Sequence, residues 1–119
     1  MKTFKDLKVW QKSTKIVQQI YIHTKKYPRE EIFGIIAQTR RCAVSIPCNI
    51  AEGYGRRSTK DYLRFLNISM GSLYELTTLL EIARLLDFIT ENVFIELSNL
   101  VREIERMLSS LINKIQQHS

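Results

Sequence analysis

Residues 90–115, TENVFIELSNLVREIERMLSSLINKI, decide the fold. Their apolar side chains recur at intervals of three and four, which places them on one face of a helix. These side chains are Leu97, Leu100, Val101, Ile104, Met107, Leu108, Leu111 and Ile115. The Thr90 hydroxyl can accept a hydrogen bond from a free backbone N–H at the start. The stretch therefore predicts a long amphipathic helix that packs on one side only.

The first of three earlier amphipathic segments is expected to be helical over residues 6–25, with Asp6 as its N-cap. One broad arc of this helix carries Val9, Trp10, Ile16, Val17, Ile20 and Tyr21. The opposite side carries a row of lysines, Lys5, Lys8, Lys12 and Lys15. This division predicts an apolar face toward the core and a basic face toward solvent.

The second segment is expected to begin at Pro28, because proline is favoured in the first helical turn. Pro47 lies inside its apolar pattern and removes one backbone hydrogen bond, so we expect a kink there. The pattern resumes in phase at Ile50, which favours one continuous helix. Gly53 and Gly55 predict its end, with glycine in the left-handed conformation of a helix C-cap.

The third segment begins with Ser58 as the expected N-cap and runs to about residue 86. It is apolar on two sides. One side carries Leu66, Met70, Leu73 and Leu80, and the other carries Ile68, Leu79, Ile82 and Leu86. Because a bundle core needs only one apolar stripe, the second stripe predicts burial against another copy of the chain.

The four segments predict an all-α fold, an antiparallel up-down-up-down four-helix bundle in one domain over residues 1–119. Short connections force sequential helices to run antiparallel. The chain has only four Gly and two Pro, which favours a few long helices. We also expect it to be oligomeric.

A cytoplasmic location is expected, because the charged start of the chain lacks the apolar stretch of a signal peptide. No stretch is long and apolar enough for a membrane span. Cys42 and Cys48 are six residues apart in one helix and point in different directions, so they cannot form a disulfide with each other. We expect two buried free thiols and no metal or cofactor.

Positive charge is concentrated in the first half of the chain. Residues 1–60 carry 13 Lys and Arg against four Asp and Glu, whereas residues 61–119 carry five against eight. This asymmetry indicates an acidic partner or complementary surfaces that meet on assembly. Candidate phosphate contacts are the four lysines of the first helix together with Arg56, Arg57, Lys60 and Arg64. The alternative is a solvated turn and a solvated helix face that only keep the bundle soluble.

No arrangement typical of an enzyme stands out. There is no Glu-x-x-His pair of the kind that binds two metal ions in helical bundles, and neither cysteine has a histidine nearby in the sequence. The glycine-rich stretch at residues 53–60 has no strand before it and lacks the ending of a phosphate-binding loop. We therefore expect a protein that is not an enzyme.

A polar series on the second helix shares one face, and further polar residues interrupt the apolar third helix. These residues are Arg41, Ser45, Asn49, Glu52, Ser72 and Glu75. Because buried polar groups must satisfy one another, we expect a structural network in which Arg41 pairs with Glu75 or Glu52. The alternative is that the network forms a recognition surface or a subunit contact.

Three stretches resemble a known bacterial family: FKDLKVWQK at residues 4–12, QTRRCAVSIPCNIAEG at 38–53 and GSLYEL at 71–76. The family is that of the four-helix bundle proteins encoded in intervening sequences of 23S ribosomal RNA genes. The resemblance implies an antiparallel bundle and a ring-like pentamer. One branch resembles the accessory protein of diversity-generating retroelements, which binds a reverse transcriptase and nucleic acid. Cys48 departs from the family, which more often has a small residue such as serine there.

The leading functional hypothesis is a homo-oligomeric bundle that binds RNA or DNA, ribosomal or from a retroelement, mainly through phosphates. Its rival is an adaptor or scaffold whose basic surface meets an acidic protein such as a reverse transcriptase. An enzyme with a pocket between subunits is the third hypothesis.

Overall fold

The computed structural model describes residues 3–118 and is all-α over that range. It has four long helices, α1 (Lys8–Thr24), α2 (Ile35–Tyr54), α3 (Thr59–Leu85) and α4 (Glu91–Gln117). Two short 3-10 helices precede α1 and α2, namely η1 (Phe4–Asp6) and η2 (Arg29–Glu31). The prediction of four helices and no strands is therefore confirmed for the described residues.

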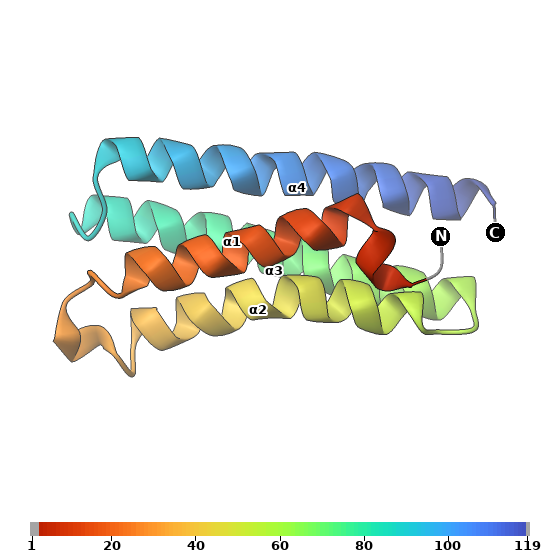
Figure 1. Ribbon diagram of the computed structural model, residues 1–119, viewed down its shortest axis with the longest axis horizontal. Coiled ribbons are helices and arrows are strands. Elements are labelled where there is room, and N and C mark those ends of the chain that lie inside the picture. The colour runs from red at the N-terminus through yellow and green to blue at the C-terminus, as the bar shows by residue number, and fades with distance from the viewer. Residues whose placement is uncertain (1–2, 119) are drawn as a thin grey trace.

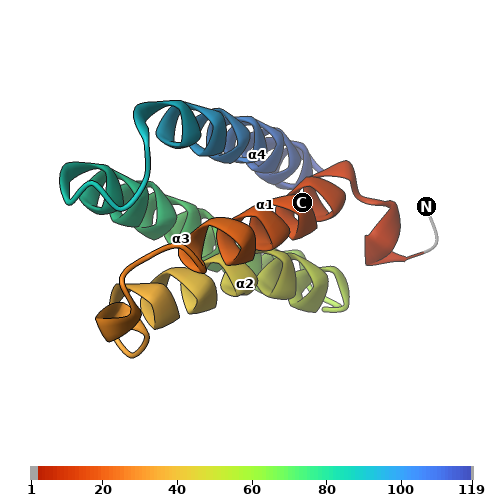
Figure 2. The same cartoon turned by 60° about the vertical axis from the view of Figure 1, so that its left-hand side comes forward.

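Successive helices run in opposite directions, and the bundle is about twice as long as it is wide (Figure 1). Its extents are 45 × 25 × 21 Å. Each helix packs on the one that follows it, and α4 returns to pack on α1, so the helices enclose one interior (Figure 2). This arrangement is the predicted up-down-up-down bundle.

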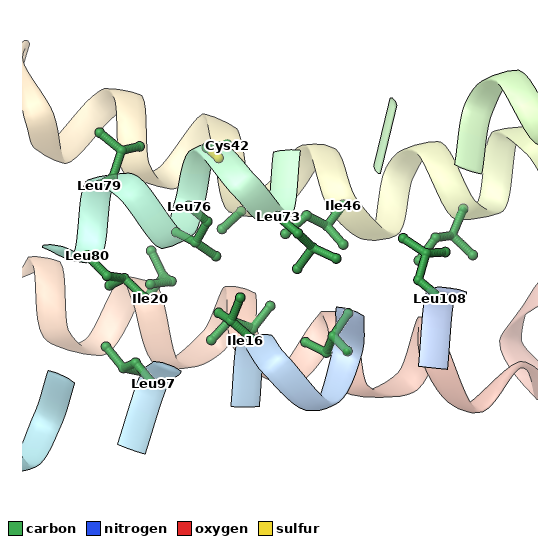
Figure 3. Close-up of a cluster of buried hydrophobic side chains, with 14 of the residues drawn as sticks. Ile16, Ile20, Cys42, Ile46, Leu73, Leu76, Leu79, Leu80, Leu97 and Leu108 are labelled. Carbon is green, nitrogen blue, oxygen red and sulfur yellow. The ribbon is translucent and has the colours of Figure 1, made fainter. Parts of the chain in front are cut away.

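Branched apolar side chains from all four helices fill the interior (Figure 3). Several of these side chains are at most 1% exposed, namely Ile16, Ile20, Ile46, Leu73, Leu76, Leu80, Leu97 and Leu108. Full burial of one such side chain contributes on the order of 1.5–3 kcal/mol. The three-and-four spacing in each helix thus supplies the main stabilising term of the fold.

Two of the three predicted N-caps are confirmed. The Ser58 hydroxyl accepts a hydrogen bond from the Asp61 N–H at 3.1 Å, and the Thr90 hydroxyl accepts one from the Val93 N–H at 3.2 Å. The prediction for Asp6 is wrong. The Asp6 carboxylate accepts from the Thr3 N–H at 3.1 Å and so closes η1, and α1 begins after Leu7.

The ends of the second predicted segment also differ from expectation. Pro28 precedes the short helix η2, and α2 begins only after Gly34. Gly55, at the other end, is in the ordinary right-handed region at φ −79° and ψ −4°, so the left-handed cap is wrong. The Gly55 N–H donates to the carbonyls of Ala51 and Gly53, and the helix ends there without a residue in the left-handed conformation.

Gly53 has a packing role that the sequence did not show. A Cβ at this position would lie 2.9 Å from the Phe65 Cβ and 3.0 Å from the Tyr62 Cδ1 of α3. Only a residue without a side chain permits this approach. Gly53 therefore allows α2 and α3 to close together just before the turn that joins them.

The helix α2 continues through Pro47, as the apolar pattern that resumes at Ile50 predicts. Pro47 itself is buried. Both cysteines are free, but only Cys42 is buried and Cys48 is exposed. The expectation of two buried thiols is wrong because Cys42 lies at the contact with α3, beside Ser72, whereas Cys48 lies on the outer side of α2.

The second apolar stripe of α3 is divided between the interior and the surface. Leu79 is buried against the bundle, whereas Ile68 is 41% exposed and Ile82 is 38% exposed. Leu86, just after the helix, is 55% exposed. An apolar stripe on this side of α3 is therefore left uncovered by the chain itself.

Within residues 3–118, none of the helices combines the length and apolar content that crossing a lipid bilayer requires.

Candidate nucleic-acid interface

The turn from α2 to α3 carries the basic corner, which we define as Arg56, Arg57, Lys60 and Arg64. All four side chains belong to exposed residues. Arg57 and Lys60 form no ion pair with any carboxylate among residues 3–118. They flank the first turn of α3, where the helix dipole and free N–H groups attract anions.

The other two cations of the basic corner share an aromatic support. The guanidinium of Arg56 lies 4.7 Å from the Phe65 ring centroid, and that of Arg64 lies 4.4 Å from it. Cation–π contact of this kind holds a guanidinium in place without neutralising it. The sequence reasoning missed Phe65, although its position one residue after Arg64 was a usable signal.

Two carboxylates offset part of this charge. The Glu52 Oε1 lies 3.2 Å from the Arg56 Nη2, and the Asp61 Oδ1 lies 3.7 Å from the Arg64 Nε. Both pairs are exposed, so each contributes at most about 1 kcal/mol and exchanges readily with a stronger anion. The unpaired Arg57 and Lys60 therefore form the strongest part of the basic corner.

The row of lysines on α1 lies beside α4 rather than facing open solvent throughout. Lys8, Lys12 and Lys15 border a hollow of about 300 Å³ between these helices. The Lys12 ammonium pairs with Glu103 of α4 at 3.1 Å. One of the predicted phosphate contacts is thus already partnered by a carboxylate of the chain.

The structure does not merge the two basic groups into one patch. The row runs along the side where α1 meets α4, and the basic corner lies where α2 meets α3, on the other side of the bundle. They approach only at one end, where η1, which contains Lys5, lies at the same end as the α2–α3 turn (Figure 1). The candidate interface is therefore the basic corner with Lys5 near it.

Part of the predicted polar network joins α2 to α3. The Ser45 and Ser72 hydroxyls lie 2.9 Å apart, and the Asn49 amide donates to the Ser45 carbonyl at 2.8 Å. Glu75 accepts from the Gln38 amide at 3.4 Å. These contacts link the helices across their seam.

The predicted pairing of Arg41 is wrong. Arg41 forms no ion pair within the described part of the chain, and Glu52 belongs to the basic corner through Arg56. Arg41 points instead toward a hollow between α1 and α2. Its neighbours along α2, Gln38 and Ser45, make the contacts to Glu75 and Ser72 of α3 instead.

Cys42 is a network member that the sequence reasoning left out. Its thiol donates to the Ser72 carbonyl at 3.0 Å. Burial, together with the nearby Glu75 carboxylate, raises the pKa of Cys42 to about 12. The thiol therefore stays protonated at neutral pH, which disfavours nucleophilic chemistry at this position.

Comparisons with known proteins agree on the relatives of this chain. The family model described as 23S rRNA-intervening sequence protein matches residues 5–110. A crystal structure at 1.70 Å resolution, of a protein with unknown function from the S23 ribosomal protein family of Bacteroides thetaiotaomicron, superposes with a TM-score of 0.82. That structure is 28% identical in sequence, and the match covers 88% of this chain and 95% of that one. No curated protein sequence matches significantly.

Proposed function

This chain belongs to the 23S rRNA-intervening sequence protein family, and on that basis we propose that it is a cytoplasmic homo-oligomer that binds RNA or DNA. Binding uses phosphates and involves little readout of base sequence, and no reaction is catalysed. The observation that carries the proposal is the exposed pair Arg57 and Lys60, which has no carboxylate partner in the described chain and stands at the N-terminal turn of α3.

The chemistry of the basic corner suits phosphate. Arginine offers two parallel N–H donors to one phosphate, and the α3 N-terminus adds backbone N–H groups. Phe65 holds two further guanidiniums beside this turn. The net charge of +6 draws polyanions toward the protein from a distance.

A second candidate function rests on another hollow between α1 and α4, next to the start of α1. It combines Lys8 and Lys114 with the apolar Met107 and Leu111. Cations around apolar side chains are typical of a contact with an acidic protein segment, such as one on a reverse transcriptase. A partner that co-purifies after nuclease treatment would support this adaptor function over nucleic-acid binding.

The proposed function predicts the effect of reversing charge at the basic corner. In the double variant Arg57→Glu, Lys60→Glu we expect the affinity for RNA at low salt to fall about tenfold or more, because phosphate contacts are replaced by repulsion. Fluorescence anisotropy with a labelled RNA measures this loss.

The matched control is the double variant Arg102→Glu, Arg106→Glu on α4, which changes the net charge by the same amount. We expect it to weaken binding far less, because only long-range attraction is lost. Equal losses in the two variants would show that the basic corner is not the binding site.

A further inference from the structure

The hollow between α1 and α2 has a volume of about 600 Å³ and an unusual lining. Ile32, Ala37 and Val44 give it apolar walls, and Arg40 and Arg41 stand at its edge. No carboxylate of residues 3–118 lines it. We call it the α1–α2 groove. Its chemistry suits an apolar ridge that carries an acid.

The two arginines of the α1–α2 groove are not equivalent. Arg40 donates to the Thr24 hydroxyl at 2.9 Å and stacks on the Tyr21 ring at 4.7 Å. Arg41 is exposed and has no ion pair among residues 3–118. A guanidinium beside apolar walls, with its charge unmatched, is a position where an incoming carboxylate gains affinity and orientation.

A ridge of the required kind lies on α3 of the same chain. Ile68, Gly71, Glu75 and Ile82 follow one another along one side of the helix and are all exposed. Glu75 stands between the two isoleucines, and its contact with the Gln38 amide, at 3.4 Å, is long. We call these four residues the α3 ridge.

Gly71 gives a separate reason to expect a neighbour on the α3 ridge. A glycine inside a helix costs about 1 kcal/mol relative to alanine. A Cβ at Gly71 would meet nothing within 4 Å, whereas a Cβ at Gly53 would collide with α3. Nothing within the chain therefore requires glycine at position 71. A glycine there leaves room for another molecule to approach the helix closely.

We propose that the α3 ridge of one copy seats in the α1–α2 groove of the next copy, with Glu75 opposite Arg41. The two surfaces match in both polarity and charge, and both are exposed in the single chain. The pairing explains at once why Arg41 lacks an acid and why glycine stands at position 71. The inference deepens the homo-oligomer part of the proposed function and rests on it.

The contact joins two different surfaces, so it is a head-to-tail contact. Each copy then offers a free groove along α2 and a free ridge on the neighbouring helix α3, and addition continues until a ring closes. The apolar stripe left uncovered on α3 becomes buried in every copy. The basic corner takes no part in the pairing of Glu75 with Arg41.

Charge reversal tests the pairing directly. Arg41→Glu and Glu75→Arg, each alone, place like charges opposite each other, and we expect each variant to sediment as a smaller species than the wild type. An equimolar mixture of the two is expected to regain contacts between unlike chains, because positions 41 and 75 then carry opposite charges. The double variant Arg41→Glu, Glu75→Arg has opposite charges at every contact for any number of copies, and we expect it to assemble like the wild type. Pairing within one chain cannot produce rescue by mixing.

A second variant covers the case in which a charge reversal unfolds the chain. Gly71→Leu adds a side chain in open space, so we expect unchanged helix content by circular dichroism together with loss of assembly. Ser109→Leu, at an exposed position of α4, is the matched control and is expected to assemble normally.

Two outcomes would overturn the inference in distinguishable ways. A wild-type protein that sediments as a monomer would refute both this contact and the homo-oligomer of the proposed function. A wild-type oligomer that persists in Gly71→Leu and in both charge variants would refute this contact alone. RNA binding is measured separately and decides neither case.

Discussion

Replacing Ile104 with alanine is expected to lower the free energy of unfolding by about 2–5 kcal/mol. Ile104 has no exposed surface and lies in the middle of α4, where it faces the shared interior. Truncation removes buried methyl groups and leaves a cavity that the surrounding leucines cannot fill completely. Urea denaturation followed by circular dichroism measures the change.

Ile95→Ala is the matched control, because it makes the same change in the same helix at a side chain that is 48% exposed. We expect it to cost less than about 1 kcal/mol. Both variants are compared at one protein concentration, since assembly shifts the apparent stability. Similar losses at the two positions would contradict the assignment of the α4 core face.

Gly53→Ala is the second variant with a large expected effect, a loss of about 1–3 kcal/mol. Helix propensity alone favours alanine over glycine by roughly 1 kcal/mol. The new methyl group would lie 2.9 Å from the Phe65 Cβ, an atom fixed to the backbone of α3, so α2 and α3 must move apart. Thermal unfolding reports the sign of the change.

Gly55→Ala separates this packing effect from a general effect of glycine in the turn. A Cβ at Gly55 would meet only backbone carbonyls of its own helix, the nearest at 3.7 Å, and its φ of −79° suits alanine. We expect no loss of stability. A left-handed cap, as the sequence indicates, would instead make Gly55→Ala the more damaging variant.

The features that the sequence predicted correctly depend on local information. The apolar spacing in residues 90–115 and the hydroxyls of Ser58 and Thr90 act within a few residues, so neighbouring positions are enough to interpret them. The family resemblance, carried by the motif around Pro47, pointed to the same bundle.

The errors occur where a competing contact decides. Asp6 is a good N-cap residue, but Thr3 lies three residues before it, and together they close η1. Arg41 and Glu75 have opposite charge, but whether they meet depends on how α2 is rotated against α3, which no local pattern specifies. Cys48 faces solvent for the same reason.

The candidate site was predicted in composition and not in arrangement. All eight cations named from the sequence are in the described structure, but Lys12 is partnered by Glu103 and two arginines stack on Phe65. Such contacts join residues that are distant in sequence or depend on side-chain direction. They concentrate the candidate interface at the basic corner.

The salt dependence of RNA affinity tests the central claim, phosphate binding at the basic corner, most directly. For a single-stranded RNA we expect the logarithm of the association constant to fall linearly with the logarithm of salt concentration. In Arg57→Gln, Lys60→Gln the slope should become shallower by about 1.4, which corresponds to roughly 0.7 for each lost phosphate contact. An affinity that is indifferent to salt, or a slope unchanged in this variant, would contradict the account.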